Sequence, residues 1–365
     1  MKRILPFSIL TLVVFTLLIR CKSDPIPPSD EASVDSGVIN DASDVVWNLT
    51  DIGKEVPEAG SFDFQTPGIG PILYNGGDIL TKPINIYVIW YGKWDSGTIA
   101  ILTDLLSSFG TSSYNKTNTD YYQACGAPQI GDTEFVRCPP QGGNSPIDFK
   151  NRRALAVVAD ASSSLPPCET YATANIKVVQ NDLINYTHGA SLYCGDVETI
   201  ITEEIGSNHL PLDPDGVYFV FTSKDVYADT NYYDVFCGNM CGWHNNMFVN
   251  GLNIRYSFVG DTERCPSDCS AKDKYIEYGF DHSPNYDWSA DGMSSVIIHE
   301  LSEMMTDPDS TAWYSSDGSE TMDHCAWVYG KLFITGNGSV ANTTIGDRDY
   351  LLQESWSMTQ SCINP

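Results

Sequence analysis

Ten cysteines between residues 125 and 362 restrict the folds open to this chain, because each disulfide fixes the distance between two segments. In an exported protein, an even number of cysteines indicates a disulfide framework. Two C-x-x-x-C pairs could instead supply metal thiolates, but their spacing is looser than the two-residue gap of many zinc knuckles. We predict disulfides, with the pairing open, among Cys125, Cys138, Cys168, Cys194, Cys237, Cys241, Cys265, Cys269, Cys325 and Cys362.

The first 21 residues predict a secretory signal. The segment "MKRILPFSILTLVVFTLLIRC" has a basic start, Lys2 and Arg3, followed by an apolar run over residues 4–19. Such a run is typical of a signal sequence rather than of a stable membrane span. We therefore expect a secreted, extracellular protein, with an uncleaved anchor or a lipid anchor at Cys21 as alternatives. Arg20 fits the lipoprotein pattern poorly.

Residues 22–66 are rich in Asp, Ser and Pro and lack periodic apolar positions, which predicts a flexible acidic leader. Residues 67–365 show no internal repeat and no Pro/Ser-rich linker, so we expect one globular domain there. The chain is long enough, and with 42% hydrophobic residues apolar enough, to bury a large core. N-glycosylation sequons, which fit an exported eukaryotic protein, occur at Asn48, Asn115, Asn185, Asn337 and Asn342.

The acidic composition excludes several classes of partner. A net charge of −27, from 20 Lys and Arg against 47 Asp and Glu, would repel nucleic acid and anionic membranes. No P-loop or G-x-G-x-x-G motif predicts a nucleotide site, and no G-x-S-x-G elbow predicts a serine hydrolase. We expect membrane association only through the lipid anchor that Cys21 could carry.

Apolar runs alternating with helical spacing predict an α/β fold with a mixed central sheet covered by helices, with α+β as the alternative. The runs at 84–92, 154–160, 216–226 and 256–261 predict strands, and the patterns at 96–110, 176–185 and 197–206 predict helices. The segment 237–269 is rich in Gly, Asn, Asp and Ser, which favours long disulfide-stapled loops over regular structure.

The chemistry candidate is the segment "DGMSSVIIHELSEMMTDP", which predicts a helix from an N-cap at Asp291 to Pro308. His299 and Glu303 are four residues apart and share one helix face, with Glu300 beside them. This resembles the H-E-x-x-H zinc helix, whose outer residues bind metal and whose glutamate activates a water. Here Glu303 replaces the second histidine. A carboxylate can bind zinc, but it also opens the site to manganese or calcium.

The segment "SSDGSETMDHCAW" offers the nearest further ligands, Glu320, Asp323 and His324. Glu320 and Asp323 are three apart and would share a face in a helix, so one could bind the metal while the other orients a ligand. We expect His299, Glu303 and Glu320 to bind a divalent metal, with zinc the expected ion. Asp323 is the further ligand candidate, and Glu300 is the expected catalytic base.

A solvated helix face is the alternative, because surface helices often carry a His and two Glu without any ligand. Against it, Glu300 adjoins the apolar stripe, where an unpaired carboxylate is costly to bury. Asp307 and Asp309, around Pro308, predict a turn rather than a calcium site. His244 follows a cysteine and could approach the site, but nothing in its pattern assigns it a role.

Several segments together resemble the plant EXORDIUM (phosphate-induced protein) family. "GGDILTKPINIYVIWYGKW" is similar to its leading segment, "DGVYFVFTSKDV" to a central strand, and "FCGNMCGWH" and "ERCPSDC" to its paired C-x-x-x-C segments. "CAWVYGK" and the terminal Cys362 resemble its end. The resemblance spans residues 76–362 and implies a secreted, cysteine-bridged protein of the apoplast or cell exterior, linked to growth.

The candidate helix departs from that resemblance, because the plant pattern has small and apolar residues where His299, Glu300 and Glu303 stand. "HELSEMMTDPDSTAWY" instead resembles segments of microbial secreted proteins that look like metallopeptidases. The leading expectation is a secreted metal-dependent hydrolase, a peptidase acting on peptide or extracellular-matrix substrates. The alternatives are a non-enzymatic extracellular or cell-wall protein acting in growth or nutrient response, and a calcium-stabilised binding module.

Overall fold

Five strands form one mixed sheet at the centre of a computed structural model that describes residues 55–68, 70–124, 169–193, 195–229 and 235–363. Neighbouring strands follow the order β5-β2-β7-β10-β9; the first four run parallel, and β9 pairs antiparallel with β10 at one end. The mixed α/β sheet predicted from the sequence is therefore confirmed. The strands are β2 (Ile84–Tyr91), β5 (Ile176–Ile184), β7 (Gly216–Thr222), β9 (Gly242–Val249) and β10 (Leu252–Gly260).

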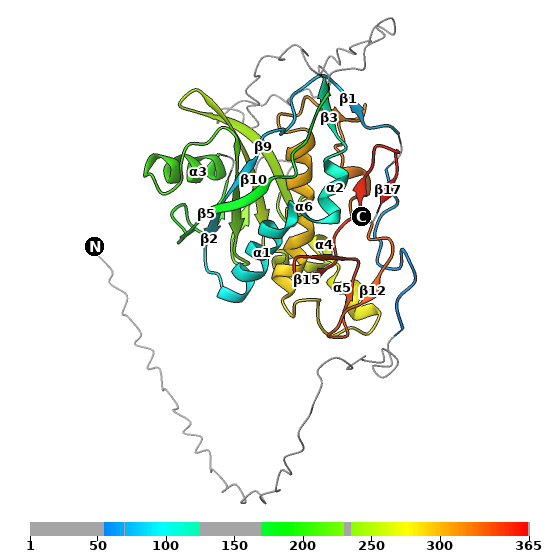
Figure 1. The fold of residues 1–365 in the computed structure, drawn as a ribbon. Coiled ribbons are helices and arrows are strands. Elements are labelled where there is room, and N and C mark those ends of the chain that lie inside the picture. The colour runs from blue at the N-terminus through cyan, green and yellow to red at the C-terminus, as the bar shows by residue number, and fades with distance from the viewer. Residues whose placement is uncertain (1–54, 69, 125–168, 194, 230–234, 364–365) are drawn as a thin grey trace, which may run out of the picture. The chain divides into compact units, whose positions relative to one another are not determined.

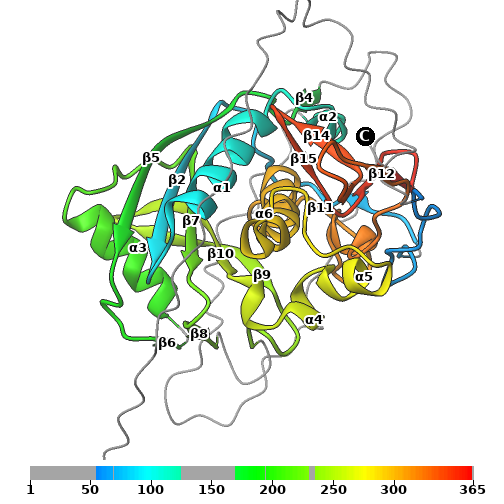
Figure 2. The same ribbon diagram turned by 90° about the horizontal axis from the view of Figure 1, so that it is seen from below.

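Helices cover both faces of this sheet (Figures 1 and 2). Helices α1 (Ser96–Phe109) and α6 (Trp288–Thr306) pack on one face, while α3 (Asp196–Gly206) packs on the other. All seven residues of β7 are buried, as are almost all those of β2, which is typical of central parallel strands covered on both faces. The apolar runs predicted as strands at these positions thus form the core.

Local signals explain where two of the helices begin. Asp95 caps α1, because its Oδ1 accepts hydrogen bonds from the backbone N–H groups of Gly97 and Thr98. Helix α3 follows Gly195, whose φ of 89° is in the left-handed region, and it has Asp196 and Glu198 in its first turn. Both helices were predicted from their apolar spacing.

The prediction of a helix at 176–185 is wrong, because residues 176–184 form β5, a strand at the edge of the sheet. The pairing with β2 shifts after Val178, so that Ile86 faces Val178 but Tyr87 faces Gln180. Val179 is therefore an extra residue in the strand, a β-bulge that breaks the alternation of apolar and polar positions. The broken alternation resembles helical spacing, which accounts for the error.

The Cys-rich middle is also more regular than predicted, because it contains the β9–β10 hairpin. Val249 pairs with Leu252 across a two-residue loop, Asn250–Gly251, in which both residues have positive φ (50° and 80°). Asn-Gly is the preferred sequence for such a turn. That dipeptide was the available signal for the hairpin, and the many polar and glycine residues around it hid the strands.

Three disulfides join described cysteines and confirm the predicted framework for these six. Cys237 is bonded to Cys265 and Cys241 to Cys269, so the two C-x-x-x-C segments are linked to each other. The third disulfide joins Cys325 and Cys362. The first two disulfides hold the residues just before β9 against helix α4 (Pro266–Cys269).

Short elements complete the fold on the α6 side of the sheet and at the strand ends. Thr262–Arg264 (η3) and Asp323–Cys325 (η4) are 3-10 helices. The remaining helices are α2 (Ser113–Asn118) and α5 (Lys272–Glu277). Three two-stranded pairs are β1 (Leu73–Tyr74) with β11 (Trp313–Tyr314), β3 (Tyr122–Ala124) with β4 (Glu169–Tyr171), and β6 (Ser191–Leu192) with β8 (Tyr227–Ala228). Three more are β12 (Phe333–Ile334) with β13 (Val340–Ala341), β14 (Thr343–Ile345) with β15 (Arg348–Tyr350), and β16 (Ser355–Trp356) with β17 (Cys362–Ile363).

Several predictions fall outside the described residues: the signal, Cys21, most of the leader, the strand at 154–160, Asn48 and four cysteines, Cys125, Cys138, Cys168 and Cys194. Within the described ranges, no helix is long and apolar enough to cross a membrane.

Two of the predicted glycosylation sites are buried in the folded chain. The side-chain amide of Asn115 donates to Gly110 O, and that of Asn342 donates to Tyr329 O and Leu352 O. A glycan on either nitrogen would require the surrounding core to open. Asn185 is exposed and stays a prediction, while Asn337 Nδ2 donates to Pro284 O.

Ordered packing begins before residue 67, although we assign residues 22–66 to the leader. Phe62 is fully buried and contacts Tyr275 and Tyr278, and Asp63 Oδ1 accepts hydrogen bonds from the backbone N–H groups of Tyr329 and Gly330. The end of the predicted leader therefore belongs to the folded unit, and the other domain boundaries stay predictions.

Truncating Phe62 tests this boundary. Phe62→Ala should lower the free energy of unfolding by about 3–5 kcal/mol, since it removes a fully buried ring. Val56→Ala, at a half-exposed position of the same segment, should change it by less than about 0.5 kcal/mol. Urea unfolding of both variants measures the difference, and equal small effects would place residues 55–66 outside the cooperative unit.

Candidate metal centre

Helix α6 carries the candidate motif and begins one turn earlier than predicted. Its N-cap is Asp287, whose Oδ1 accepts a hydrogen bond from the backbone N–H of Ala290. Asp291, predicted as the cap, lies in the first turn and accepts hydrogen bonds from Asn285 instead. The helix ends at Thr306, two residues before Pro308, as the proline predicts.

Helix α6 is buried on nearly all sides, so the alternative of a solvated polar face is wrong. The predicted stripe is buried against the sheet and α1, and most residues on the other sides of the helix are buried as well. Backbone hydrogen bonds from Met322 and Asp323 to Glu303 hold the segment around η4 against the helix. The exposed fractions of the His299, Glu300 and Glu303 side chains are 14%, 7% and 4%. Ionisable groups at such depth need partners, because desolvating an unpaired charge is costly.

The structure brings His299, Glu303 and Asp323 together. His299 Nε2 lies 3.3 Å from Glu303 Oε1 and 3.5 Å from Asp323 Oδ1. On the other side of the ring, Nδ1 is 3.0 Å from Gln353 Oε1, an acceptor, so Nδ1 carries the proton in the neutral ring. This hydrogen bond leaves the Nε2 lone pair directed at the two carboxylates, as in histidines that bind a metal.

A second histidine, His244 on β9, lies on the other side of Glu303. Its Nδ1 is 3.3 Å from Glu300 Oε2 and 3.6 Å from Glu303 Oε2, and its Nε2 is 3.5 Å from Glu320 Oε1. The sequence suggested that His244 could approach the site but gave it no role. The composition of 237–269 predicts loops, whereas His244 lies on β9, a strand beside α6 that fixes the direction of the ring.

The two carboxylates expected beyond the helix therefore separate. Asp323 faces His299, while Glu320 faces His244, and the two do not share a helix face because only Asp323–Cys325 is helical. His324 turns away and packs edge-on against Trp356, with ring centroids 4.7 Å apart.

Backbone hydrogen bonds hold the 320–323 segment against the helix. Glu303 Oε1 accepts hydrogen bonds from the backbone N–H groups of Met322 (3.2 Å) and Asp323 (3.1 Å). Asp323 Oδ2 in turn accepts one from Glu320 N–H at 2.9 Å. The Glu303 carboxylate thus fixes the segment that supplies two of the candidate ligands.

Asp307 is a fully buried carboxylate next to this group. Its Oδ1 accepts the backbone N–H groups of Thr311 and Ala312, which confirms the predicted turn after α6. Burial, with the neighbouring Glu320 carboxylate, holds the pKa of Asp307 well above its usual range. Asp309 lies outside the cluster and pairs with Arg255.

The cluster contains more carboxylates than histidines, and this excess of negative charge shifts the pKa values of both kinds of group. Burial raises the pKa of Glu303 to about 8. Burial alone would lower the pKa values of His244 and His299, but Glu320 and Glu300 beside His244, and Glu303 and Asp323 beside His299, outweigh it and hold both well above 6.5. The hydrogen bond and charge of His299 outweigh the effect of burial on Asp323 and lower its pKa. Without a bound cation, the cluster must therefore retain protons.

A cavity of 620 Å³ opens onto these residues. Its wall includes three disulfide-bonded cysteines and two tryptophans: Cys237, Cys241, Cys269, Trp243 and Trp327. The cluster forms another part of the wall, through His244, His299, Glu300, Glu303, Glu320 and Asp323. A volume of this size admits a few residues of a peptide or a molecule of similar size. The candidate ligands are therefore accessible from a cavity even though most of them are buried.

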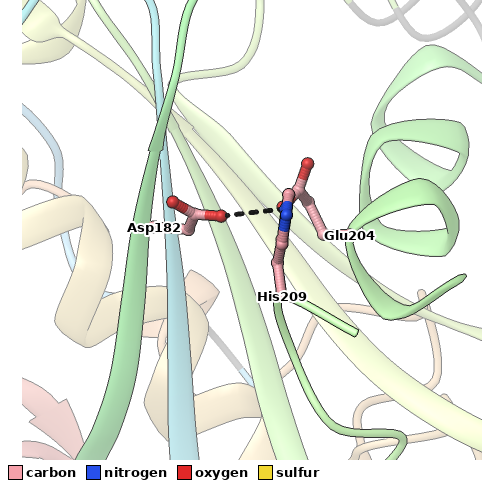
Figure 3. Close-up of side chains that lie close together, drawn as sticks. All are labelled: Asp182, Glu204 and His209. Carbon is pink, nitrogen blue, oxygen red and sulfur yellow. Dashed lines mark hydrogen bonds and ion pairs between the residues drawn. The ribbon is translucent and has the colours of Figure 1, made fainter. Parts of the chain in front are cut away.

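A third group, Asp182, Glu204 and His209, lies at the edge of the sheet, between β5 and the end of α3 (Figure 3). Both carboxylates approach the same ring nitrogen, since His209 Nδ1 is 2.9 Å from Glu204 Oε2 and 3.4 Å from Asp182 Oδ2. His209 is more than half exposed. An imidazole nitrogen shared by two carboxylates accounts for this geometry without a metal ion.

Gly242 leaves the space that Glu300 occupies. A Cβ on Gly242 would lie 2.8 Å from Val296 Cγ1, 2.9 Å from Phe258 O and 3.0 Å from Glu300 Oε1. These contacts involve packed groups on α6 and β10, which cannot move aside freely.

Adding this methyl group should disturb both stability and the site. Gly242→Ala is expected to lower the free energy of unfolding by about 1–3 kcal/mol, since the added methyl group displaces Val296 and Glu300. Gly206→Ala, at a helix position where a Cβ meets nothing within 4 Å, is the matched control and should be neutral or slightly stabilising. Thermal unfolding of both variants measures the difference; a neutral Gly242→Ala would contradict the packing described.

Comparison with known proteins identifies the chain's relatives. The sequence model of the phosphate-induced protein 1 conserved region matches residues 72–124 and 161–364, which include α6 and every residue of the cluster. No solved structure shows significant similarity to this one.

Curated relatives come from plants. Protein EXORDIUM-like 3 of Arabidopsis thaliana is 28% identical over 322 residues, covering 80% of this chain and 83% of the relative. Protein EXORDIUM-like 5 of the same plant is 28% identical over 293 residues (76% and 69%), and Protein PHOSPHATE-INDUCED 1 of Nicotiana tabacum is 24% identical over 280 residues (73% and 75%). The resemblance found in the sequence motifs is thereby confirmed, and this chain belongs to the phosphate-induced protein 1, or EXORDIUM-like, family.

Proposed function

We propose that this protein is an exported metal-dependent hydrolase, with peptides as the expected substrate class. The observation that carries the proposal is the convergence of His299 Nε2, Glu303 and Asp323 at the wall of an open cavity, with Glu300 on the same helix. Family membership alone supports no reaction, so the proposal depends on this site.

The spacing of the ligand atoms favours a cation over direct hydrogen bonds. The separations of 3.3 and 3.5 Å from His299 Nε2 exceed the usual 2.7–2.9 Å of a charge-assisted hydrogen bond. Two atoms that each lie about 2.1 Å from one tetrahedral zinc ion are about 3.4 Å apart. The three residues thus stand near the positions that ligands of a shared cation would take.

The ligand set favours zinc among the divalent ions. One imidazole and two carboxylates suit zinc, and also manganese, whereas calcium prefers six to eight oxygen ligands without nitrogen. Three protein ligands would leave the ion one free coordination position, as in catalytic rather than closed structural zinc sites, and all three ligand residues line the cavity.

Each residue has a separate role in this proposal. A bound ion would polarise a substrate carbonyl and make a water more acidic. Glu300, which lines the same cavity, accepts the proton of the attacking water, and Gln353 fixes the ring of His299 through Nδ1. The 320–323 segment, tied to Glu303 through two backbone N–H groups, holds Asp323 in place.

Export is the setting that the chain's other features support. The signal-like start, the three disulfides and the family membership all fit an oxidising compartment outside the cytoplasm, with a lipid anchor at Cys21 as the alternative to free secretion. A net charge of −27 disfavours polyanionic partners, so neutral or basic peptides and extracellular-matrix proteins are the expected substrates.

Substituting Glu300 and His299 separates binding from catalysis. In a peptide-library cleavage assay, Glu300→Gln should lower kcat at least about 100-fold while metal content stays unchanged, since the side chain is expected to move a proton and not to bind the ion. His299→Ala should lose both metal and activity. Glu203→Gln, the same change at an exposed position on α3, should match the wild type. Wild-type protein that binds metal but cleaves no member of the library would contradict the peptidase proposal.

Metal removal should expose the excess negative charge of the cluster. Glu303 has a folded-state pKa of about 8 against 4.5 in the unfolded chain, so the folded protein holds a proton that the unfolded chain has lost between these values. The stability of the metal-free protein should therefore fall as pH rises through this window. His244 and His299 act in the same direction, because their raised pKa values give stability that is complete below 6.5 and lost above it.

Thermal unfolding checks this pH dependence. In chelator, Tm should fall between about pH 5 and pH 8, and added Zn²⁺ should raise Tm most at the upper end, where bound protons no longer compete. Glu303→Gln removes one titrating group and should flatten the metal-free curve. A metal-free Tm that rises over this range would rule out the cluster as the dominant titrating site.

A further inference from the structure

We infer that the centre holds two divalent cations, the second bound by His244, Glu303 and Glu320. This inference deepens the proposed function and rests on the same cluster, but it concerns residues that the single-ion site does not use. Among the described residues, no ion pair joins His299 to His244 or Glu320; those two residues pair with each other.

His244 Nε2 is the observation that points to a second ligand. The side chain is 4% exposed, and within the described part of the chain Nε2 has no hydrogen-bond partner, nor does Glu320 Oε1. The two atoms face each other at 3.5 Å, again close to the separation of about 3.4 Å expected for two ligands of one tetrahedral ion. A buried imidazole nitrogen and a carboxylate oxygen that face each other without a hydrogen bond are costly, and a cation between these atoms would satisfy both.

In both histidines, a side-chain oxygen of a neighbouring residue holds the Nδ1 atom of the ring. Glu300 Oε2 accepts from His244 Nδ1 at 3.3 Å, as Gln353 Oε1 accepts from His299 Nδ1 at 3.0 Å. In both rings this contact places the proton on Nδ1 and leaves the Nε2 lone pair toward carboxylates. Glu300 uses Oε2 for this contact, while its Oε1 lies against Gly242 on the cavity wall.

Glu303 lies between the two positions and can serve both. Its Oε1 is 3.3 Å from His299 Nε2 and its Oε2 is 3.6 Å from His244 Nδ1. One possible ligand atom from each of His244, Glu303 and Glu320 lies within 4.8 Å of the other two. A carboxylate that gives one oxygen to each ion is a usual bridge in paired centres, in which the ions lie about 3.5–4 Å apart.

Charge balance also favours two ions. Five carboxylates gather here, Glu300, Glu303, Asp307, Glu320 and Asp323, against two histidines. Among the described residues, the ion pairs of these carboxylates involve only His244 and His299, with no Lys or Arg. Ionising all five carboxylates, with both imidazoles neutral, would give the group five negative charges. One divalent ion would leave three of these and two ions would leave one, so a second ion lowers the cost of ionising the buried group.

The donor atoms restrict the ions to zinc-like divalent metals. Each position offers one imidazole nitrogen and carboxylate oxygens, which suits Zn²⁺ or Mn²⁺ better than Ca²⁺ or Mg²⁺. Asp307 lies against Glu320, a proposed ligand of the second ion, and is itself fixed by two backbone N–H groups. It therefore helps to hold Glu320 in place.

Metal counting on the full-length protein tests the inference. Protein stripped with a chelator, reloaded with Zn²⁺ and freed of excess ion should contain two ions per chain by mass spectrometry. His244→Ala and Glu320→Gln should each reduce the count to one, and His299→Ala should leave no more than one. His209→Ala, in the exposed group of Figure 3, is the matched control and should keep two.

Manganese provides a readout that needs no variant. Wild-type protein loaded with Mn²⁺ should give the electron paramagnetic resonance spectrum of two exchange-coupled ions, and His244→Ala should give that of an isolated ion. Thermal unfolding confirms that each variant is folded.

The outcomes separate the two proposals. One ion in the wild type, or an isolated-ion Mn²⁺ spectrum, would overturn the second site and leave the single-ion hydrolase standing. A count that falls with His209→Ala but not with His244→Ala would overturn it as well, because the second ion would then lie at the sheet edge. Two coupled ions without hydrolysis of any peptide would support the paired centre and contradict the proposed function.

Discussion

The buried carboxylate of Glu303 is the group around which the site is organised. It reaches His299 through one oxygen and His244 through the other, and it also accepts two backbone N–H groups from the segment that carries Glu320 and Asp323. A 4% exposed carboxylate is stable only with such partners. Helix α6, strand β9 and the 320–323 segment therefore meet at one side chain.

The fold provides this meeting point by burying α6 rather than leaving it on the surface. The helix lies between the sheet and the C-terminal segment, so the motif residues face protein and a cavity instead of bulk water. On the opposite wall, two disulfides hold the start of β9 against α4 and limit how far His244 can move. The paired cysteines, which carry part of the resemblance to the family, thus line the same cavity as the candidate ligands.

The sequence predicted the elements whose signals are local and missed those set by pairing partners. Continuous apolar runs predicted β2 and β7, and Asp95 and Pro308 lie where a capping residue and a helix stop should lie. The strand β5 was taken for a helix because a bulge at Val179 broke its alternation, and a bulge is visible only once the neighbouring strand is known.

The site shows the same limit. The helix spacing correctly placed His299, Glu300 and Glu303 close together, since residues three and four apart are neighbours on any helix. The distribution of Glu320 and Asp323 between two histidines could not be derived in this way, because it depends on a 3-10 turn and on hydrogen bonds to Glu303. His244 is 56 residues away from Glu300 along the chain, and only the pairing of β9 with β10 directs its ring toward the helix.

Replacing the second histidine of an H-E-x-x-H helix by glutamate therefore changes more than the hardness of one ligand. An imidazole bound through Nε2 serves one ion, whereas a carboxylate has two oxygens that can serve two. At position 303 those oxygens face different histidines, and further carboxylates stand behind each. Glutamate in place of the second histidine is therefore the feature that makes a paired centre possible, because its two oxygens face His299 and His244 separately.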